Sequence, residues 1–81
     1  MAELTRQEIC LGARSWIERH GHPAEPDANR VYHCMCELGD RSLEDCVARL
    51  ADSDEPLTLD RARAAWQRLS DMADQLRQGY L

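Results

Sequence analysis

One stretch near the end of the chain limits what the sequence can fold into. Its apolar residues recur at steps of three and four, the heptad spacing of one helix face, over about five turns. Those residues are Leu59, Ala62, Trp66, Leu69, Ala73 and Leu76. Thr58 precedes the stretch as a capping residue and Gly79 follows it as a stop. A chain of 81 residues has a small core, so we expect this face to pack against the chain's own helices.

Capping residues predict three helices before this one. Thr5 and Glu8 have the spacing of a capping box, and Asp27 and Ser42 are the expected caps of two shorter helices. The predicted helices cover residues 5–20, 28–38, 43–51 and 59–78. We therefore expect an all-α fold, a small compact bundle of four helices with the last one longest. It is expected to form a single helical domain over residues 1–81.

The second helix is predicted from an apolar face and from the loop before it. Pro23 and Pro26 are expected to keep residues 21–27 out of helix, because proline lacks the backbone N–H that a helix interior needs. The residues expected on the buried face are Val31, Cys34, Met35 and Leu38.

Negative charge is concentrated in the middle of the chain. Residues 25–60 hold ten acidic residues and three arginines, a balance of −7 in a chain whose total is −5. Segregated charge selects partners of the opposite sign. The residues expected to bind a partner are Glu37, Asp40, Glu44, Asp45, Asp52, Asp54 and Glu55.

An acidic surface of this kind can imitate the phosphates of a nucleic acid and occupy a basic groove. We therefore expect a small non-enzymatic protein that inhibits or regulates a nucleic-acid-binding protein or complex. Inhibitors carried by phages and mobile elements, anti-CRISPR proteins among them, are one candidate class. The alternative is that the negative charge has no partner and only keeps the protein soluble.

A second hypothesis is a helical partner or dimerisation adaptor that uses an apolar helix face. The protein would then be a monomer with a helical partner, or a homodimer paired along the last helix. The residues at that dimer face are Leu59, Trp66, Leu69 and Leu76. Leu4 and Leu11, opposite the main apolar face of the first helix, form another candidate patch.

Cysteine and histidine residues suggest a third hypothesis, a thiol or zinc sensor built on His33, Cys34 and Cys36. Residues two apart on a helix point about 200° apart, so Cys34 and Cys36 cannot share one ion without unwinding. Cys34 is expected to be a small buried hydrophobe and Cys36 the exposed thiol that reacts first. No metal or cofactor is therefore expected. No disulfide is expected either, because nothing indicates an oxidising compartment.

Other function classes lack their sequence signals. No nucleophile motif, phosphate-binding glycine loop or paired catalytic constellation occurs, so no catalytic residue is assigned. Residues 28–51 have roughly the length of a helix-turn-helix, but Glu44 and Asp45 on its second helix would be repelled by phosphates, so no direct nucleic-acid binding is expected. The apolar runs are too short to cross a membrane and no export signal is present, so a cytoplasmic location is expected.

Overall fold

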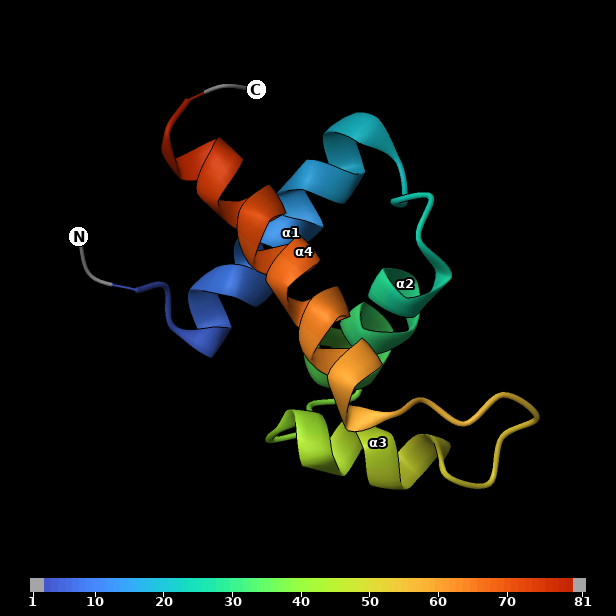
Figure 1. Ribbon diagram of the computed structural model, residues 1–81. Coiled ribbons are helices and arrows are strands. Elements are labelled where there is room, and N and C mark those ends of the chain that lie inside the picture. Colours follow the sequence, from blue (N-terminus) through green and yellow to red (C-terminus); the bar gives the residue numbers. More distant parts are fainter. Residues whose placement is uncertain (1–2, 80–81) are drawn as a thin grey trace.

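The computed structural model describes residues 3–79, which form helices and no strand. The helices are α1 (Arg6–His20), α2 (Pro26–Tyr32), the π-helical segment η1 (His33–Glu37), α3 (Leu43–Leu50) and α4 (Leu59–Arg77). η1 continues α2 without a break, so the two form one helical unit (Figure 1). The prediction of an all-α bundle of four helices with the last one longest is confirmed.

Side-chain caps begin three of the helices as predicted. The Thr5 hydroxyl accepts a hydrogen bond from the Glu8 N–H, and the Glu8 carboxylate accepts one from the Thr5 N–H, which completes a capping box. Ser42 and Thr58 accept equivalent bonds from the N–H groups of the residues three positions later. These bonds satisfy backbone donors that have no partner inside the helix.

The start of the second helix differs from the prediction. α2 begins at Pro26, two residues early, and Glu25 is its N-cap without a side-chain bond. Proline at the first helical position removes an N–H that would be unpaired there anyway, so Pro26 starts this helix instead of excluding it. Asp27 is therefore not a cap. Its carboxylate accepts two hydrogen bonds from Arg61, at 2.9 and 2.6 Å.

The end of the second helix widens into a π turn. The Leu38 N–H bonds to the His33 carbonyl five residues back, at 3.0 Å, and Gly39 then ends the helix at a φ of 78°. An α-helix would turn by about 100° for each residue, so the wider turn shifts the residues after it off the predicted face. Leu38, predicted to be buried, is accordingly 47% exposed.

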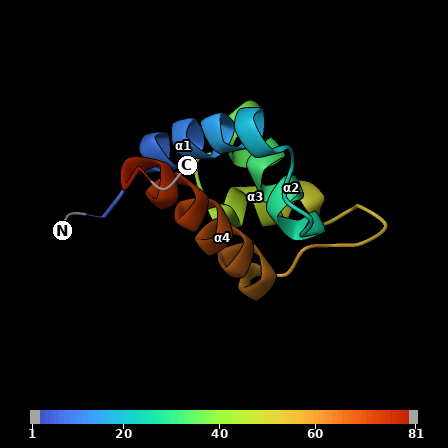
Figure 2. The same ribbon diagram turned by 90° about the horizontal axis from the view of Figure 1, so that it is seen from above.

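α1 crosses the C-terminal half of α4, whereas α2 and α3 pack near the N-terminal half of α4 (Figures 1 and 2). Residues from all of these elements meet in one hydrophobic core. Its larger fully buried side chains are Leu57, Leu69, Met72, Val31, Cys34 and Cys46. None of the helices in residues 3–79 has the length and apolarity needed to cross a lipid bilayer.

The apolar face of α4 packs within the chain. Ala62 and Leu69 are completely buried and Ala73 nearly so. Leu59, Trp66 and Leu76 are partly exposed along the edges of the same face. Leu69 therefore has no surface to offer a homodimer, although it was one of the four residues expected at such an interface.

Candidate functional site

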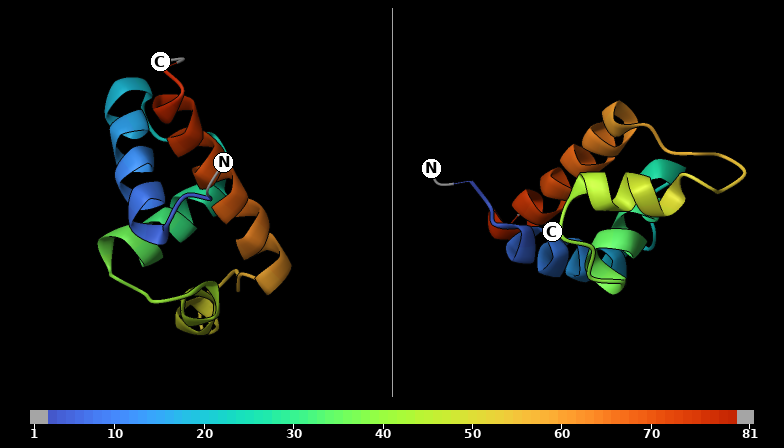
Figure 3. Two further views of the ribbon diagram at one scale, coloured as in Figure 1. Left: turned by 90° about the vertical axis from the view of Figure 1, so that its left-hand side faces the viewer. Right: turned by 90° about the horizontal axis from the view of Figure 1, so that it is seen from below.

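Six of the seven acids predicted to bind a partner are exposed, and we refer to them together as the acidic face. The acidic face consists of Glu37, Glu44, Asp45, Asp52, Asp54 and Glu55. These residues come from the end of η1, from the first turn of α3 and from the loop over residues 51–58. Seen from below, α3 lies in front of α4 and this loop extends away from the helices (Figure 3).

Asp40 is the exception, and its predicted place on the surface is wrong. It is only 7% exposed, and its two carboxylate oxygens accept hydrogen bonds from Arg49 at 2.5 to 3.2 Å. These bonds hold the pKa of the Asp40 carboxyl below its ordinary value. The Arg6 guanidinium also donates to the backbone carbonyls of Met35 and Asp40, which fixes the turn that points the Asp40 side chain inward.

Arg30 holds the acidic loop in one conformation. Its guanidinium donates to the Ser53 hydroxyl at 3.2 Å and to the Glu55 carbonyl at 2.5 Å. The Ser53 hydroxyl in turn donates to the Leu50 carbonyl at 2.7 Å, at the end of α3. The loop is thus bound to both α2 and α3 while its carboxylates stay in solvent.

Most carboxylates of the acidic face form no ion pair with an arginine of residues 3–79. Glu37 contacts the His33 ring at 2.7 Å, and Asp45 accepts the Arg41 backbone N–H at 3.2 Å. The carboxylates of Glu44, Asp52 and Asp54 have no hydrogen bond or ion pair within residues 3–79. Two of the three arginines in this acidic part of the sequence, Arg30 and Arg49, are engaged by the contacts described above.

An apolar hollow lies between the start of α1 and the end of α4. The leucines that line it are Leu4, Leu11 and Leu76. Leu11 is 56% exposed, so the patch suggested by Leu4 and Leu11 exists at the surface.

Cys10 and Cys36 form a disulfide, which contradicts two expectations from the sequence. The Cα atoms of α1 and η1 that it links are 5.3 Å apart, within the ordinary range for disulfides. Cys36 is therefore not a free reactive thiol. Tyr32 and Cys36 of the second helix lie beside Cys10 of α1, and Tyr32 is buried there.

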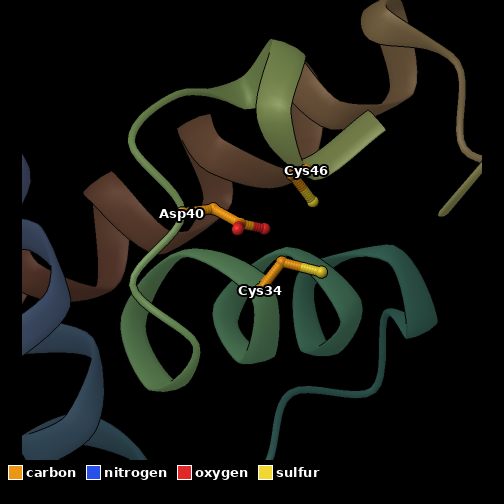
Figure 4. A group of neighbouring side chains, drawn as sticks. All are labelled: Cys34, Asp40 and Cys46. Atoms are coloured by element: carbon orange, nitrogen blue, oxygen red, sulfur yellow. The ribbon is translucent and has the colours of Figure 1, made fainter. Parts of the chain in front are cut away.

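The predicted sensor residues lie in three different environments. Cys36 is in the disulfide and His33 is exposed beside Glu37. Cys34 instead lies near Cys46 and Asp40, with all ligand atoms within 4.8 Å of one another (Figure 4). Burial is the main cause that raises the pKa of Cys46 to about 12, and a hydrogen bond with Cys34 is the second. This thiol therefore stays protonated at neutral pH.

This buried cluster has a partial signal in the sequence. Cys34 and Cys46 each fall on the apolar face of a predicted helix, and a short loop joins those two helices, so their meeting in the core agrees with the pattern. The inward turn of Asp40 has no such signal, because it depends on Arg49 and Arg6 from other elements.

Comparisons with protein-family models, with curated proteins and with solved structures find no match to this chain. A function for it therefore has to be inferred from the charge, burial and contacts of its own residues.

Proposed function

We propose that this protein acts by binding, as an inhibitor or regulator that occupies the basic nucleic-acid-binding surface of a protein partner. The acidic face is the proposed contact surface. The observation that carries the proposal is that Arg30 and Arg49, which lie near the acidic face in the sequence, bind other groups. Arg49 is paired with the inward-facing Asp40 and Arg30 with the loop backbone, so neither neutralises the exposed acids.

The number and the exposure of these acids support imitation of a nucleic acid. Basic grooves that bind nucleic acids attract rows of negative charge, and electrostatic attraction speeds encounter with such a partner. A loop held by Arg30 and Ser53 loses less conformational freedom on binding than a free loop does. An inhibitor from a phage or a mobile element, of which anti-CRISPR proteins are examples, is one class with this mode of action.

The proposal is of a non-enzymatic protein. Of its four thiols, two are joined in the Cys10–Cys36 disulfide and two are buried, with the pKa of Cys46 raised far above neutral pH. A nucleophilic thiol needs the opposite environment, one that lowers its pKa and exposes it. A partner that handles nucleic acids implies a cytoplasmic location.

The test is capture of partners from a lysate of the source organism on the immobilised protein, at low and high salt. We expect a nucleic-acid-binding protein that is captured at low salt, released at high salt, and displaced by added duplex DNA or RNA. Exposed charge pairs weaken as ionic strength rises, whereas apolar contacts do not. Partners that resist both salt and nucleic acid would contradict the proposal.

A second candidate function is supported by the apolar hollow at Leu4, Leu11 and Leu76. An exposed leucine beside a hollow can receive an apolar side chain of a partner helix. The protein would then be a helical adaptor and its charge would serve solubility. Replacing Leu11 with Glu separates the two functions, because this change removes adaptor binding and leaves binding through the acidic face intact.

A further inference from the structure

Three potential metal ligands meet in the core where η1, the following loop and α3 come together. Cys34 is 1% exposed, Asp40 7% and Cys46 0%. Figure 4 shows the two sulfur atoms and the carboxylate converging from these three elements, and their ligand atoms all lie within 4.8 Å of one another. Within residues 3–79, these two cysteines and one aspartate are the group whose ligand atoms are close enough to share a metal ion.

We propose that Cys34, Asp40 and Cys46 bind one thiophilic divalent cation, and that Zn²⁺ is the ion that suits them. Two thiolates and one carboxylate are ordinary zinc ligands, whereas Mg²⁺ and Ca²⁺ prefer oxygen ligands alone. The fourth position of a tetrahedral zinc ion is left for a water molecule, as in other sites with three protein ligands.

The separations of the ligand atoms fit this ion after a small contraction. Zinc lies about 2.3 Å from sulfur and about 2.0–2.2 Å from a carboxylate oxygen, so tetrahedral ligand atoms are roughly 3.5–3.8 Å apart. The three ligand atoms lie within 4.8 Å of one another, so shifts of about 1 Å, made by side-chain rotation, are enough to bring them onto one ion.

Charge balance favours a divalent ion at this depth in the protein. The carboxylate of Asp40 and the guanidinium of Arg49 already neutralise each other. When the ion binds, the thiols of Cys34 and Cys46 each release a proton to solvent, and the two thiolates then balance the two positive charges. The buried site is therefore neutral both with and without the ion, which avoids the cost of an uncompensated buried charge.

The bonds from Arg49 leave room for the metal on Asp40. Each carboxylate oxygen has two lone pairs. Oδ1 of Asp40 accepts two hydrogen bonds from Arg49, whereas Oδ2 accepts one and can still donate its other lone pair to zinc. Arg49 then has the place of the outer partner that commonly orients a ligating carboxylate. This inference is independent of the proposed binding function.

The experiment uses the full chain with Cys10 and Cys36 both replaced by Ser. In this variant every remaining thiol belongs to the cluster, and a phosphine reductant keeps both reduced without opening a disulfide. Co²⁺ is titrated first, because thiolate-bound tetrahedral cobalt gives a charge-transfer band and intense visible bands. We expect saturation at one Co²⁺ per chain, displacement of cobalt by Zn²⁺, and a higher Tm with Zn²⁺ than without.

The matched control replaces Cys34 and Cys46 with Ala, keeps the disulfide, and is titrated without the reductant, which would open it. It is expected to show no cobalt bands and no change of Tm with Zn²⁺, while circular dichroism confirms its helices. If that variant fails to fold, Asp40→Asn in the C10S/C36S background takes its place, with cobalt binding weakened at least about tenfold by loss of one ligand.

Three results would overturn the site. The first is an absence of cobalt bands in the C10S/C36S variant while it is folded and reduced. The second is the same bands in the Cys34 and Cys46 control, which would place the ion elsewhere. The third is a Cys34–Cys46 disulfide, found by mass spectrometry, that forms in the presence of Zn²⁺.

Discussion

Gly12 of α1 lies against Ala73 of α4 so closely that a methyl group at position 12 would come within 2.4 Å of the Ala73 Cβ and 2.7 Å of its Cα. The two longest helices therefore cross where one of them has no side chain. This contact sets the distance between α1 and α4.

Replacing Gly12 with Ala is expected to destabilise the protein in spite of the better helix propensity of alanine. Overpacking typically costs about 1–3 kcal/mol, and the gain in propensity is just under about 1 kcal/mol. Because the Ala73 backbone must also move, we expect a net loss of about 1–2 kcal/mol in the free energy of unfolding by urea.

The control for this contact is the swapped double variant, Gly12→Ala with Ala73→Gly. It moves the methyl group from α4 to α1 and is expected to recover most of the stability that Gly12→Ala loses. If the effects of the two substitutions simply add, the helices do not touch at this crossing.

The Asp40–Arg49 pair predicts a pH-dependent stability. Its hydrogen bonds lower the pKa of the folded Asp40, so the stability that the pair contributes is present above the unfolded pKa, about 3.9, and is lost as the pH falls through the folded pKa. In Arg49→Met the buried carboxylate has no partner, so its pKa is raised and stability is lost as the pH rises instead.

Thermal unfolding from pH 3 to pH 8 measures this difference. We expect Arg49→Met to lower Tm at pH 7 by roughly 5–15 °C, with a smaller difference from wild type near pH 3. Arg61→Met is the control, because its partner Asp27 is partly exposed whereas Asp40 is buried, and it is expected to have a much smaller effect. A loss of the same size at both pH values would show that Arg49 acts through packing alone.

The disulfide predicts a dependence on reductant. Cys10 and Cys36 are 26 residues apart, and in the chain-entropy model closing such a loop stabilises the folded state by about 3–4 kcal/mol. We expect reductant to lower the urea midpoint of the oxidised wild type and to leave Cys10→Ser/Cys36→Ser unchanged. Denatured, unreduced wild type should present two free thiols, those of Cys34 and Cys46. Four free thiols in protein purified without reductant would contradict the disulfide.

Arg30→Met is expected to loosen the acidic loop more than it destabilises the protein. Arg30 Nη1 is buried without a hydrogen-bond partner among the described residues, and this cost offsets much of the gain from the bonds to Ser53 and Glu55. We expect amide exchange of residues 51–56 to become about tenfold faster, with little change in Tm. Unchanged exchange would mean that the loop does not depend on Arg30.

The sequence predicts those parts of this fold that depend on local interactions. Thr5, Ser42 and Thr58 cap their helices as expected, since each cap bonds only to a residue three positions away. Pro26 was misassigned because the same residue either excludes a helix or begins one, depending on its position in the first turn. The π turn at His33–Glu37 likewise has no local signature, and it moved Leu38 into solvent.

The candidate site was predictable only in part. Charge counts identified the acidic segment, and exposure followed for six of its seven named acids. The burial of Asp40 depends on Arg49 and Arg6, which reach it from other elements, and the Cys10–Cys36 bond depends on how α1 packs on η1. Such contacts between helices are set by tertiary packing, which periodicity within one helix does not specify.

The most direct test of the acidic face compares two triple variants that change the net charge equally. One neutralises the loop, with Asp52→Asn, Asp54→Asn and Glu55→Gln. The control neutralises three exposed acids away from α3, with Glu3→Gln, Glu18→Gln and Asp71→Asn. The measurement is the affinity of each for the captured partner across a range of salt concentrations.

We expect the loop variant to bind roughly 3- to 150-fold more weakly at low salt, since each exposed charge pair contributes about 0.2–1 kcal/mol, and to show a shallower salt dependence. The control should bind as the wild type does. Equal weakening of both variants would show that only net charge matters, and no weakening of the loop variant would contradict the acidic face as the binding surface.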